Sequence, residues 1–396
     1  MRPLEEIVVL DFSRVLSGPY CTMQLADLGA RVIKIEQPGR GDDTRAWGPP
    51  FLGEQSTYFL SINRNKESLA LDLKHPSAPA IVNALLARAD VVVENFRPGT
   101  MDRLGYGYER VAGAHPGIVY CSISGFGQTG PRRAEPGYDA VMQAEGGLMS
   151  ITGAADGPPF RLGVAIADIA TGLFAAQGIL AALIARGTTG RGQLVDVGML
   201  DSVASLLTYQ AGIVFATGAS PGRMGNRHPS ISPYDTFSAS DGAFVLAVGN
   251  DEQFRRMMVL VGQPAVADDP RYATNRARVQ HYDALRTVLQ GVFASWTREA
   301  LVRALTAAGV PCGAVRSVGE TLADPQIAAR GMIVPLQHAD AGEVRVLGNP
   351  VKLSETPADV RTAPPALGEH TTKILRNDVG LGEDEIRSLR ETGAIA

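Results

Sequence analysis

The chain has 396 residues, of which 45% are hydrophobic and 20% are charged, and its formal net charge is −4. This length predicts two or three domains with ample core, and the composition is typical of a soluble globular protein. The weakly acidic charge offers no electrostatic basis for nucleic-acid binding.

Cysteine usage and the first residues indicate the compartment. The three cysteines, Cys21, Cys121 and Cys312, are far apart and form no CxxC pair, so we expect free thiols in a reducing compartment rather than disulfides or a zinc site. The N-terminus carries acidic residues early and enters a strand directly, which argues against a signal or transit peptide. We therefore expect a cytoplasmic protein, or one from an organelle lumen if a targeting piece has been removed.

The first predicted unit is β-α-β. Residues 7–12 and 31–36 are short apolar runs rich in β-branched side chains, and residues 18–28 between them have helical periodicity. Such a unit implies a parallel sheet with a right-handed crossover. The first turn has no G-x-G-x-x-G and the chain has no G-x-x-x-x-G-K-[ST], so we expect neither a bound dinucleotide nor a P-loop ATPase.

The next elements extend this pattern. Strands are predicted at residues 68–73, 91–93, 118–123 and 194–197, and helices at residues 76–89 and 199–216. Asn95, Arg97 and Arg103 follow the strand at 91–93. Because ligands of open parallel sheets bind at the carboxyl ends of the strands, these side chains are candidates for a binding site, with exposed loop charges as the alternative.

From residue 220 the character of the chain changes. Residues 221–237 are rich in Gly, Pro and polar side chains, which is typical of a linker or lid. A strand at residues 244–248 and amphipathic helices at residues 251–261, 282–294 and 298–308 follow. They predict a second, smaller α/β or α+β domain.

A long apolar stretch at residues 162–185 contains one carboxylate, Asp168, and burying an unpaired carboxylate is costly. Three interpretations are open: a transmembrane helix, which a central Asp disfavours; a core helix with a satisfied structural Asp; and a functional carboxylate at a buried helix start. Thr171, Gly172 and Ala175 share its helical face and leave room for a ligand. Free N–H groups of a helix N-terminus would keep a nucleophilic carboxylate ionised.

The histidines do not point to a metal. The six of them never fall at metal-ligand spacing, so we expect no metal site. A carboxylate nucleophile remains the candidate for covalent chemistry.

Nine segments occur in a fixed order along nearly the whole chain. They are VLDFSRVLSGP (9–19), DLGARVIKIEQPGRGDDTR (27–45), NRNKESLALDLK (63–74), ADVVVENFRPG (89–99), LGYGYE (104–109), SGFGQTGP (124–131), GYDAVMQA (137–144), ITGAADGPPFRLGVAIADIATG (151–172) and APPALGEHT (363–371). Together they closely resemble the class III CoA-transferases, the group of formyl-CoA transferase and carnitine-CoA transferase. The segments WGPPF and VGNDEQF, and the R-x-G-N…S-I-x-P-Y pattern, look most like the branch acting on succinate, glutarate and hydroxymethylglutarate.

The resemblance implies a fold of class α/β: a Rossmann-like parallel-sheet large domain plus a smaller α/β domain, in a homodimer whose two chains are interlocked like rings. We accordingly divide the chain into a large CoA-binding domain (1–200), a connecting helix and linker (201–225), a small domain (226–331) and a C-terminal segment that returns to the large domain (332–396).

The resemblance also implies the site. The catalytic aspartate of the family falls on Asp168, and CoA or acyl-CoA is a substrate rather than a permanent cofactor. Two family positions that are basic in formyl-CoA transferase are Gln37 and Pro136 here, so Arg40, Arg132 and Arg133 are candidates to replace those phosphate contacts. The CoA contacts carried over from the family are Leu16, Ser17, Leu71, Asp72, Leu73, Lys74, Asn95, Phe96, Arg103, Tyr138 and Asp139.

The family chemistry predicts that Asp168 attacks the thioester of a donor acyl-CoA, for which succinyl-CoA is our candidate, and forms a mixed anhydride. Gly249 and Asn250 are our candidates for a mobile shield and oxyanion contact, with an ordinary turn as the alternative. A dicarboxylic acceptor needs a cation for its distal carboxylate, which suits a guanidinium. The candidates for that role are Arg14, Arg45, Arg64 and Arg227.

Two rival functions belong to other classes. An acyl-CoA racemase on the same fold needs an acid/base pair, and its branch has His where this chain has Tyr138, a poor base at neutral pH. The other rival is a non-catalytic CoA-binding protein. We expect no nucleic-acid or membrane partner.

Overall fold

The computed structural model describes residues 2–396, which divide into two compact units. The first unit comprises the described residues up to Leu148, together with residues 161–211 and 325–396. The second comprises residues 149–160 and 212–324. Relative to the predicted division, the second unit also takes in residues 149–160 and 212–225, and the return to the first unit begins at Pro325 instead of residue 332.

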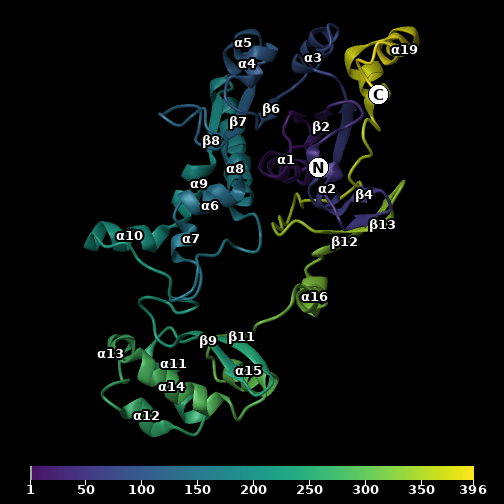
Figure 1. Ribbon diagram of the computed structural model, residues 1–396. Helices are drawn as coiled ribbons and strands as arrows, with labels where there is room; N and C mark the ends of the chain where they lie inside the picture. Colours follow the sequence, from purple (N-terminus) through teal and green to yellow (C-terminus); the bar gives the residue numbers. More distant parts are fainter. Residues whose placement is uncertain (1) are drawn as a thin grey trace. The chain divides into compact units, whose positions relative to one another are not determined.

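A six-stranded sheet in the order β5-β2-β1-β6-β7-β8 is the centre of the first unit (Figure 1). Every neighbouring pair is parallel, so the strands share one carboxyl edge. β-Branched and other apolar side chains fill most of the central strands, as burial on both faces requires. The strands are β1 (Val8–Asp11), β2 (Arg31–Glu36), β5 (Lys66–Ala70), β6 (Val91–Glu94), β7 (Val119–Ser124) and β8 (Leu194–Gly198).

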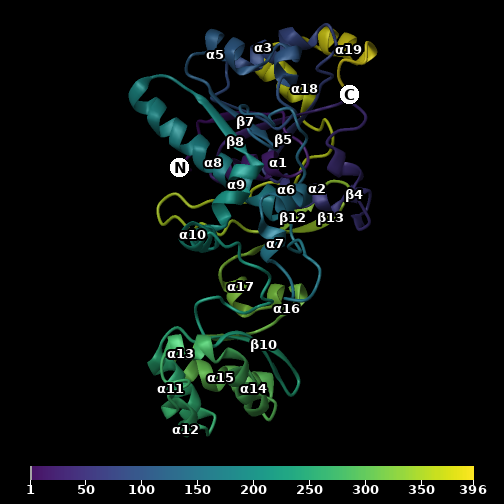
Figure 2. The same ribbon diagram turned by 60° about the vertical axis from the view of Figure 1, so that its left-hand side comes forward.

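Helices cover both faces of this sheet (Figure 2). On one face, α1 (Ser17–Asp27) and α8 (Ile166–Thr189) pack their apolar side chains on β1, β6 and β7. On the other face, α3 (Ala78–Leu86) packs beside α18 (Thr371–Ile374) and α19 (Glu383–Glu391). The C-terminal segment therefore belongs to the core of the first unit.

α8 resolves the open question about the apolar stretch around Asp168. By length and composition it could cross a membrane, as could the bent pair α9 (Met199–Leu206) and α10 (Thr208–Thr217). One side of α8 is buried against α1 and the sheet, with Ile179 fully covered. This packing identifies α8 as a core helix, while Ile184 on another side is 77% exposed.

The predicted single helix over residues 199–216 is wrong, because α9 and α10 meet at an angle of 75°. The break falls at Thr208, which has a φ of +40°. A β-branched residue rarely adopts this conformation, so nothing in the local pattern signals the break.

The second unit has a three-stranded antiparallel sheet in the order β11-β10-β9, packed against helices. Three aromatic rings, Phe237, Phe244 and Phe293, contact one another in its core. Its elements are β9 (Tyr234–Ala239), β10 (Gly242–Ala247), α11 (Asp251–Leu260), α12 (Pro264–Asp268), α13 (Asn275–Gln280), α14 (Tyr282–Phe293), α15 (Arg298–Ala307), β11 (Cys312–Ala314) and α16 (Val318–Leu322).

Smaller elements complete the chain. Two hairpins, β3–β4 and β12–β13, lie outside the main sheets. The remaining elements are η1 (Asp43–Ala46), β3 (Phe51–Leu52), β4 (Gln55–Ser56), α2 (Thr57–Ile62), α4 (Thr100–Leu104), α5 (Tyr108–Ala114), α6 (Asp139–Glu145), α7 (Leu148–Ile151), α17 (Pro325–Ala329), β12 (Ile333–His338), β13 (Gly342–Leu347) and η2 (Leu375–Val379).

Candidate active site

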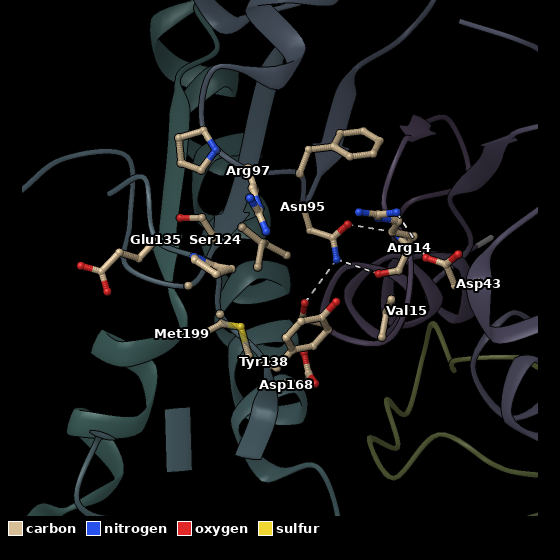
Figure 3. A pocket seen from close by; sticks show the side chains of 17 residues that line it. Arg14, Val15, Asp43, Asn95, Arg97, Ser124, Glu135, Tyr138, Asp168 and Met199 are labelled. Carbon is tan, nitrogen blue, oxygen red and sulfur yellow. Dashed lines mark hydrogen bonds and ion pairs between the residues drawn. The ribbon is translucent and has the colours of Figure 1, made fainter. Parts of the chain in front are cut away.

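A cavity of about 190 Å³ opens beyond the carboxyl ends of β1, β6 and β7 in the first unit (Figure 3). Its walls come from the loop after β1, the turn after β6, the end of β7 and the start of α6. This is the edge where ligands of open parallel sheets bind. Asp168, Ser17, Asn95, Ser124 and Tyr138 all line it.

Asp168 is in the first turn of α8 and is partly buried. Burial, followed by the charge of the neighbouring Asp139, raises the pKa of Asp168 to about 7, although the side chain and backbone of Ser17 act to lower it. Near neutral pH the group is therefore poised between its two forms, which is typical of a catalytic carboxylate.

Asp139 has a structural task at the start of α8. One of its carboxylate oxygens accepts the backbone N–H of Ala167 at 2.8 Å and that of Asp168 at 3.4 Å. Gln143 donates to the other oxygen at 2.7 Å, and its own amide oxygen accepts the N–H of Leu162. Asp139, predicted as a CoA contact, thus caps from another helix the amides that α8 leaves free.

Close backbone approach brings α8 against α1. A Cβ on Gly172 would lie 2.6 Å from the carbonyl oxygen of Ser17, so only glycine allows this contact. The contact lies one helical turn beyond Asp168, and it brings Ser17, the first residue of α1, to the carboxylate.

Asn95 joins the loops after β1 and β6. Its side-chain amide donates to the carbonyl oxygen of Arg14 at 2.7 Å and accepts the N–H of the same residue at 2.8 Å. It also reaches the hydroxyl of Ser17 at 3.5 Å. Figure 3 shows these contacts beside the cavity. The predicted CoA contact Asn95 is therefore a clamp between two loops of the site.

A second cavity, of about 640 Å³, adjoins the first, and the two share Arg14, Asp43 and Phe96. The structure thus brings the predicted CoA contacts around two adjoining hollows of one unit. Those lining the second cavity are Leu71, Asp72, Leu73, Lys74, Phe96 and Arg103, and Gln37 and Arg40 lie there too. Leu16 is buried beside the site and lines neither cavity.

The candidates to replace the missing phosphate contacts differ in their availability. Arg40 pairs with Asp43 at 2.5 Å and stays largely exposed. Arg132 is bound to Glu135 and Glu145. Arg133 is exposed and lines neither of the two cavities. Arg97, predicted separately as a ligand contact after the strand at 91–93, lines the first cavity.

The arginines predicted for a distal carboxylate lie in different settings. Arg64 is buried in an ion pair with Asp27, and Arg45 is paired with Glu36, and neither residue lines either of these two cavities. Both placements argue against a substrate-binding role. Arg14 lines both cavities and pairs with Asp43 at 3.2 Å. Arg227 lies in the second unit, stacked on Tyr282.

Gly249 and Asn250 lie in the second unit, between β10 and α11. The side chain of Asn250 accepts the N–H of Gln253 at 2.8 Å, and the N–H of Gly249 donates to the side chain of Gln253 at 2.8 Å. This arrangement is a helix cap. The shielding role remains a prediction.

Three residues near the site escaped sequence analysis. Tyr58 packs with Ala165 and Ile169 in a small cluster, and burial, followed by the charge of Asp168, raises its pKa to about 12. Burial also raises the pKa of Glu94, at the end of β6, to about 7. The buried hydroxyl of Ser124 has no hydrogen-bond partner among residues 2–396, and Ser124 lines the first cavity. Glu94 and Ser124 carried a signal, since both end parallel strands.

No group of three or more His, Cys, Asp or Glu side chains that could hold a metal occurs within residues 2–396.

Comparison with known proteins covers nearly the whole chain. Residues 4–371 match the family model described as CoA-transferase family III. The chain is 42% identical over 395 residues to succinyl-CoA:glutarate CoA-transferase of Mus musculus, covering 100% of this chain and 91% of the relative. It is 44% identical over 379 residues to succinate–glutarate CoA-transferase of Agrobacterium fabrum, with 94% and 95% covered. A crystal structure of a CAIB/BAIF family protein from Brucella suis matches with a TM-score of 0.86 at 42% identity, covering 95% of this chain and 99% of that one.

Proposed function

This chain belongs to CoA-transferase family III, and we propose that it moves CoA from succinyl-CoA to a second dicarboxylic acid through covalent intermediates on Asp168. The observation that carries the proposal is a carboxylate with a pKa of about 7 lining a cavity at the carboxyl edge of the sheet. The named relatives, which act on succinyl-CoA or succinate and on glutarate, support the choice of acids.

The reaction begins when a carboxylate oxygen of Asp168 attacks the thioester carbonyl of succinyl-CoA. The C–S bond breaks, CoA leaves as a thiolate, and a mixed anhydride links Asp168 to succinate. The thiolate then attacks the aspartyl carbonyl and releases succinate, which leaves an aspartyl thioester. The acceptor carboxylate repeats these steps in reverse, so the product thioester forms without ATP and Asp168 is regenerated.

The surroundings of Asp168 suit this chemistry. The carboxylate must be ionised to attack, and the side chain and backbone of Ser17 favour that form. An anhydride hydrolyses in water, so the partly buried position of Asp168 protects the intermediate. The tail of CoA would occupy the larger cavity beside Lys74 and Arg103, and its thiol would reach Asp168 in the smaller one.

The distal carboxylate of the acid needs a cation. Among the four predicted arginines, Arg14 is the one that lines the cavity of Asp168. Its guanidinium is half exposed and pairs with Asp43, so an incoming carboxylate could compete for it. We propose that the guanidinium of Arg14 binds the distal carboxylate of the acid.

We also propose the homodimer, with interlocked chains, that the family resemblance implies. All of α10 is at least partly exposed, including Phe215 at 88% and Tyr209 at 55%, and Ile184 on α8 is similarly uncovered. Exposed apolar side chains in such number indicate a protein partner. Light scattering after size exclusion would give twice the chain mass if this is correct.

Chemical trapping tests the central proposal. Incubation with succinyl-CoA and hydroxylamine should convert Asp168 to its hydroxamate, which mass spectrometry locates on the peptide around that residue. Labelling that needs succinyl-CoA and disappears in Asp168→Ala supports the nucleophile. Trapping elsewhere, or transfer activity retained by Asp168→Ala, overturns it.

A further inference from the structure

Four buried ionisable side chains lie beneath residues 12–19, which comprise the connection from β1 to α1 and the first residues of that helix, and which we call the loop below. Lys66 pairs with Asp11 at 3.2 Å, and Lys34 pairs with Asp42 at 2.9 Å. Their exposed fractions are between 0% and 4%. We call this group the lysine–aspartate cluster. The mechanism uses none of its members as reactants, yet burying so many charges is costly, so the cluster needs an explanation.

Hydrogen bonds of the cluster end on the loop. Lys34 donates to the carbonyl oxygen of Ser13 at 2.8 Å, and Lys66 donates to that of Pro19 at 2.9 Å. Asp11 accepts the N–H of Ser13 at 2.9 Å. The loop is thus anchored on both sides of Ser17 by charged groups that have little freedom to move.

The middle of the loop is held as well. Asp42 accepts the N–H of Val15 at 3.2 Å, and Val15 has a φ of +69°, a conformation that a β-branched residue adopts only when its surroundings enforce it. The strained residue is two positions before Ser17. The cluster therefore fixes a shape that the loop would not take by itself.

Ser17 is the part of this loop that meets the reacting group. It lines the same cavity as Asp168, its carbonyl oxygen lies against Gly172 one turn further along α8, and its hydroxyl and backbone N–H lower the pKa of Asp168. We propose that the lysine–aspartate cluster positions Ser17 against Asp168, with Lys66 and Lys34 acting through the loop that they anchor. The inference rests on the proposed role of Asp168 and adds positioning residues to it.

The other groups that face Asp168 act in the opposite direction or are neutral. Asp139 on α6 raises the pKa of Asp168, and Tyr58 on α2 is uncharged at neutral pH. The interactions that lower this pKa are those of Ser17. Lys66 faces Asp11, Lys34 and Asp42, and burial lowers the pKa of Lys66 to about 8, so it is charged at neutral pH.

The test is the pH profile of kcat. Ser17→Ala removes the hydroxyl and keeps the N–H, and Lys66→Met removes the charge with an unbranched side chain that is one atom shorter. Both should move the acid limb of the profile upward, by about half a unit and about one unit respectively. The double variant should move it no further than Lys66→Met, because both act through Ser17.

Arg31→Met is the matched control. Arg31 lies at the opposite end of β2 from the site and pairs with Asp378 and Glu67. Its loss should lower the unfolding temperature and leave the acid limb in place. If Lys66→Met does not fold, Thr22→Val removes a hydroxyl that donates to Asp11 at 2.6 Å and should give a smaller shift in the same direction.

The outcomes separate the two claims. Unshifted profiles in Lys66→Met and Thr22→Val, with Asp168→Asn inactive, overturn the positioning role alone. An active Asp168→Asn overturns the proposed nucleophile and this inference with it.

Discussion

Two groups of buried carboxylates in the first unit have opposite electrostatics. Burial would raise the pKa of Asp11, but Lys66 and Lys34, with hydrogen bonds from Ser13 and Thr22, hold it below its usual value. Asp168 is also withdrawn from water, yet its charged neighbour is another carboxylate, and its pKa rises to about 7. Pairing makes the first carboxylate inert and structural, whereas the lack of a paired cation keeps the second reactive.

Glu94 extends the comparison. It is 5% exposed, accepts the N–H of Phe96 at 2.9 Å and has a pKa raised to about 7 by burial, with smaller contributions from Asp102 and Asp196. It resembles Asp168 in electrostatics but does not line the cavity. A raised pKa therefore indicates a catalytic group here only together with access to a ligand.

The largest expected effect separates the two groups by activity. Asp168→Asn removes the nucleophile and should lower kcat by about 1,000-fold or more, because the remaining amide cannot form the anhydride. Steady-state transfer from succinyl-CoA to glutarate measures it, with circular dichroism as the control for folding. A variant retaining a tenth of the activity would place the chemistry elsewhere.

Stability should show the reverse pattern. Asp11→Asn leaves Lys66 buried without its partner and should reduce the free energy of unfolding by about 3–5 kcal/mol. Asp168→Asn leaves no cation unpaired and should not destabilise the chain. Urea titration of both variants at pH 7 tests this, and equal losses would remove the distinction between a paired and an unpaired carboxylate.

Glu94→Gln should stabilise the protein at alkaline pH. Because the folded state holds a proton on Glu94 up to about pH 7, the stability of the wild type falls as pH rises from about 4.5 through 7. Gln keeps the neutral form, so the variant should gain about 2–3 kcal/mol at pH 8 and little at pH 5. A gain of the same size at pH 5 and pH 8 would show that burial does not destabilise the ionised form of Glu94.

The smallest expected effect is on KM for the carboxylic acid substrate. Arg14→Ala removes a half-exposed guanidinium at the cavity and should raise KM for succinate about tenfold while changing KM for acetate little. Arg45→Ala, which breaks a buried pair with Glu36, is the contrast and should cost stability first. Equal changes in both KM values for Arg14→Ala would exclude a dicarboxylate contact there.

Much of this arrangement was predictable from the sequence. Apolar runs marked β1, β2, β6 and β7, and the cost of burying a charge singled out Asp168 before its surroundings were known. These signals depend only on residues that are close together along the chain.

Features that depend on distant partners were not predictable. Arg64 and Asp27 are 37 positions apart, and only folding shows that each neutralises the other. The cap that Asp139 provides to α8 joins residues 28 positions apart. From the sequence alone, Arg64 and Asp139 were both candidates for contacts with a ligand.

Gly172 sets a limit for anyone who would re-engineer this protein. Because its hydrogen faces the Ser17 carbonyl with no space for a methyl group, the two helices form a single mechanical joint. Libraries that enlarge or reshape the acyl pocket can vary the loops around that joint, but a change at position 172 would part the helices and take the reacting carboxylate out of alignment.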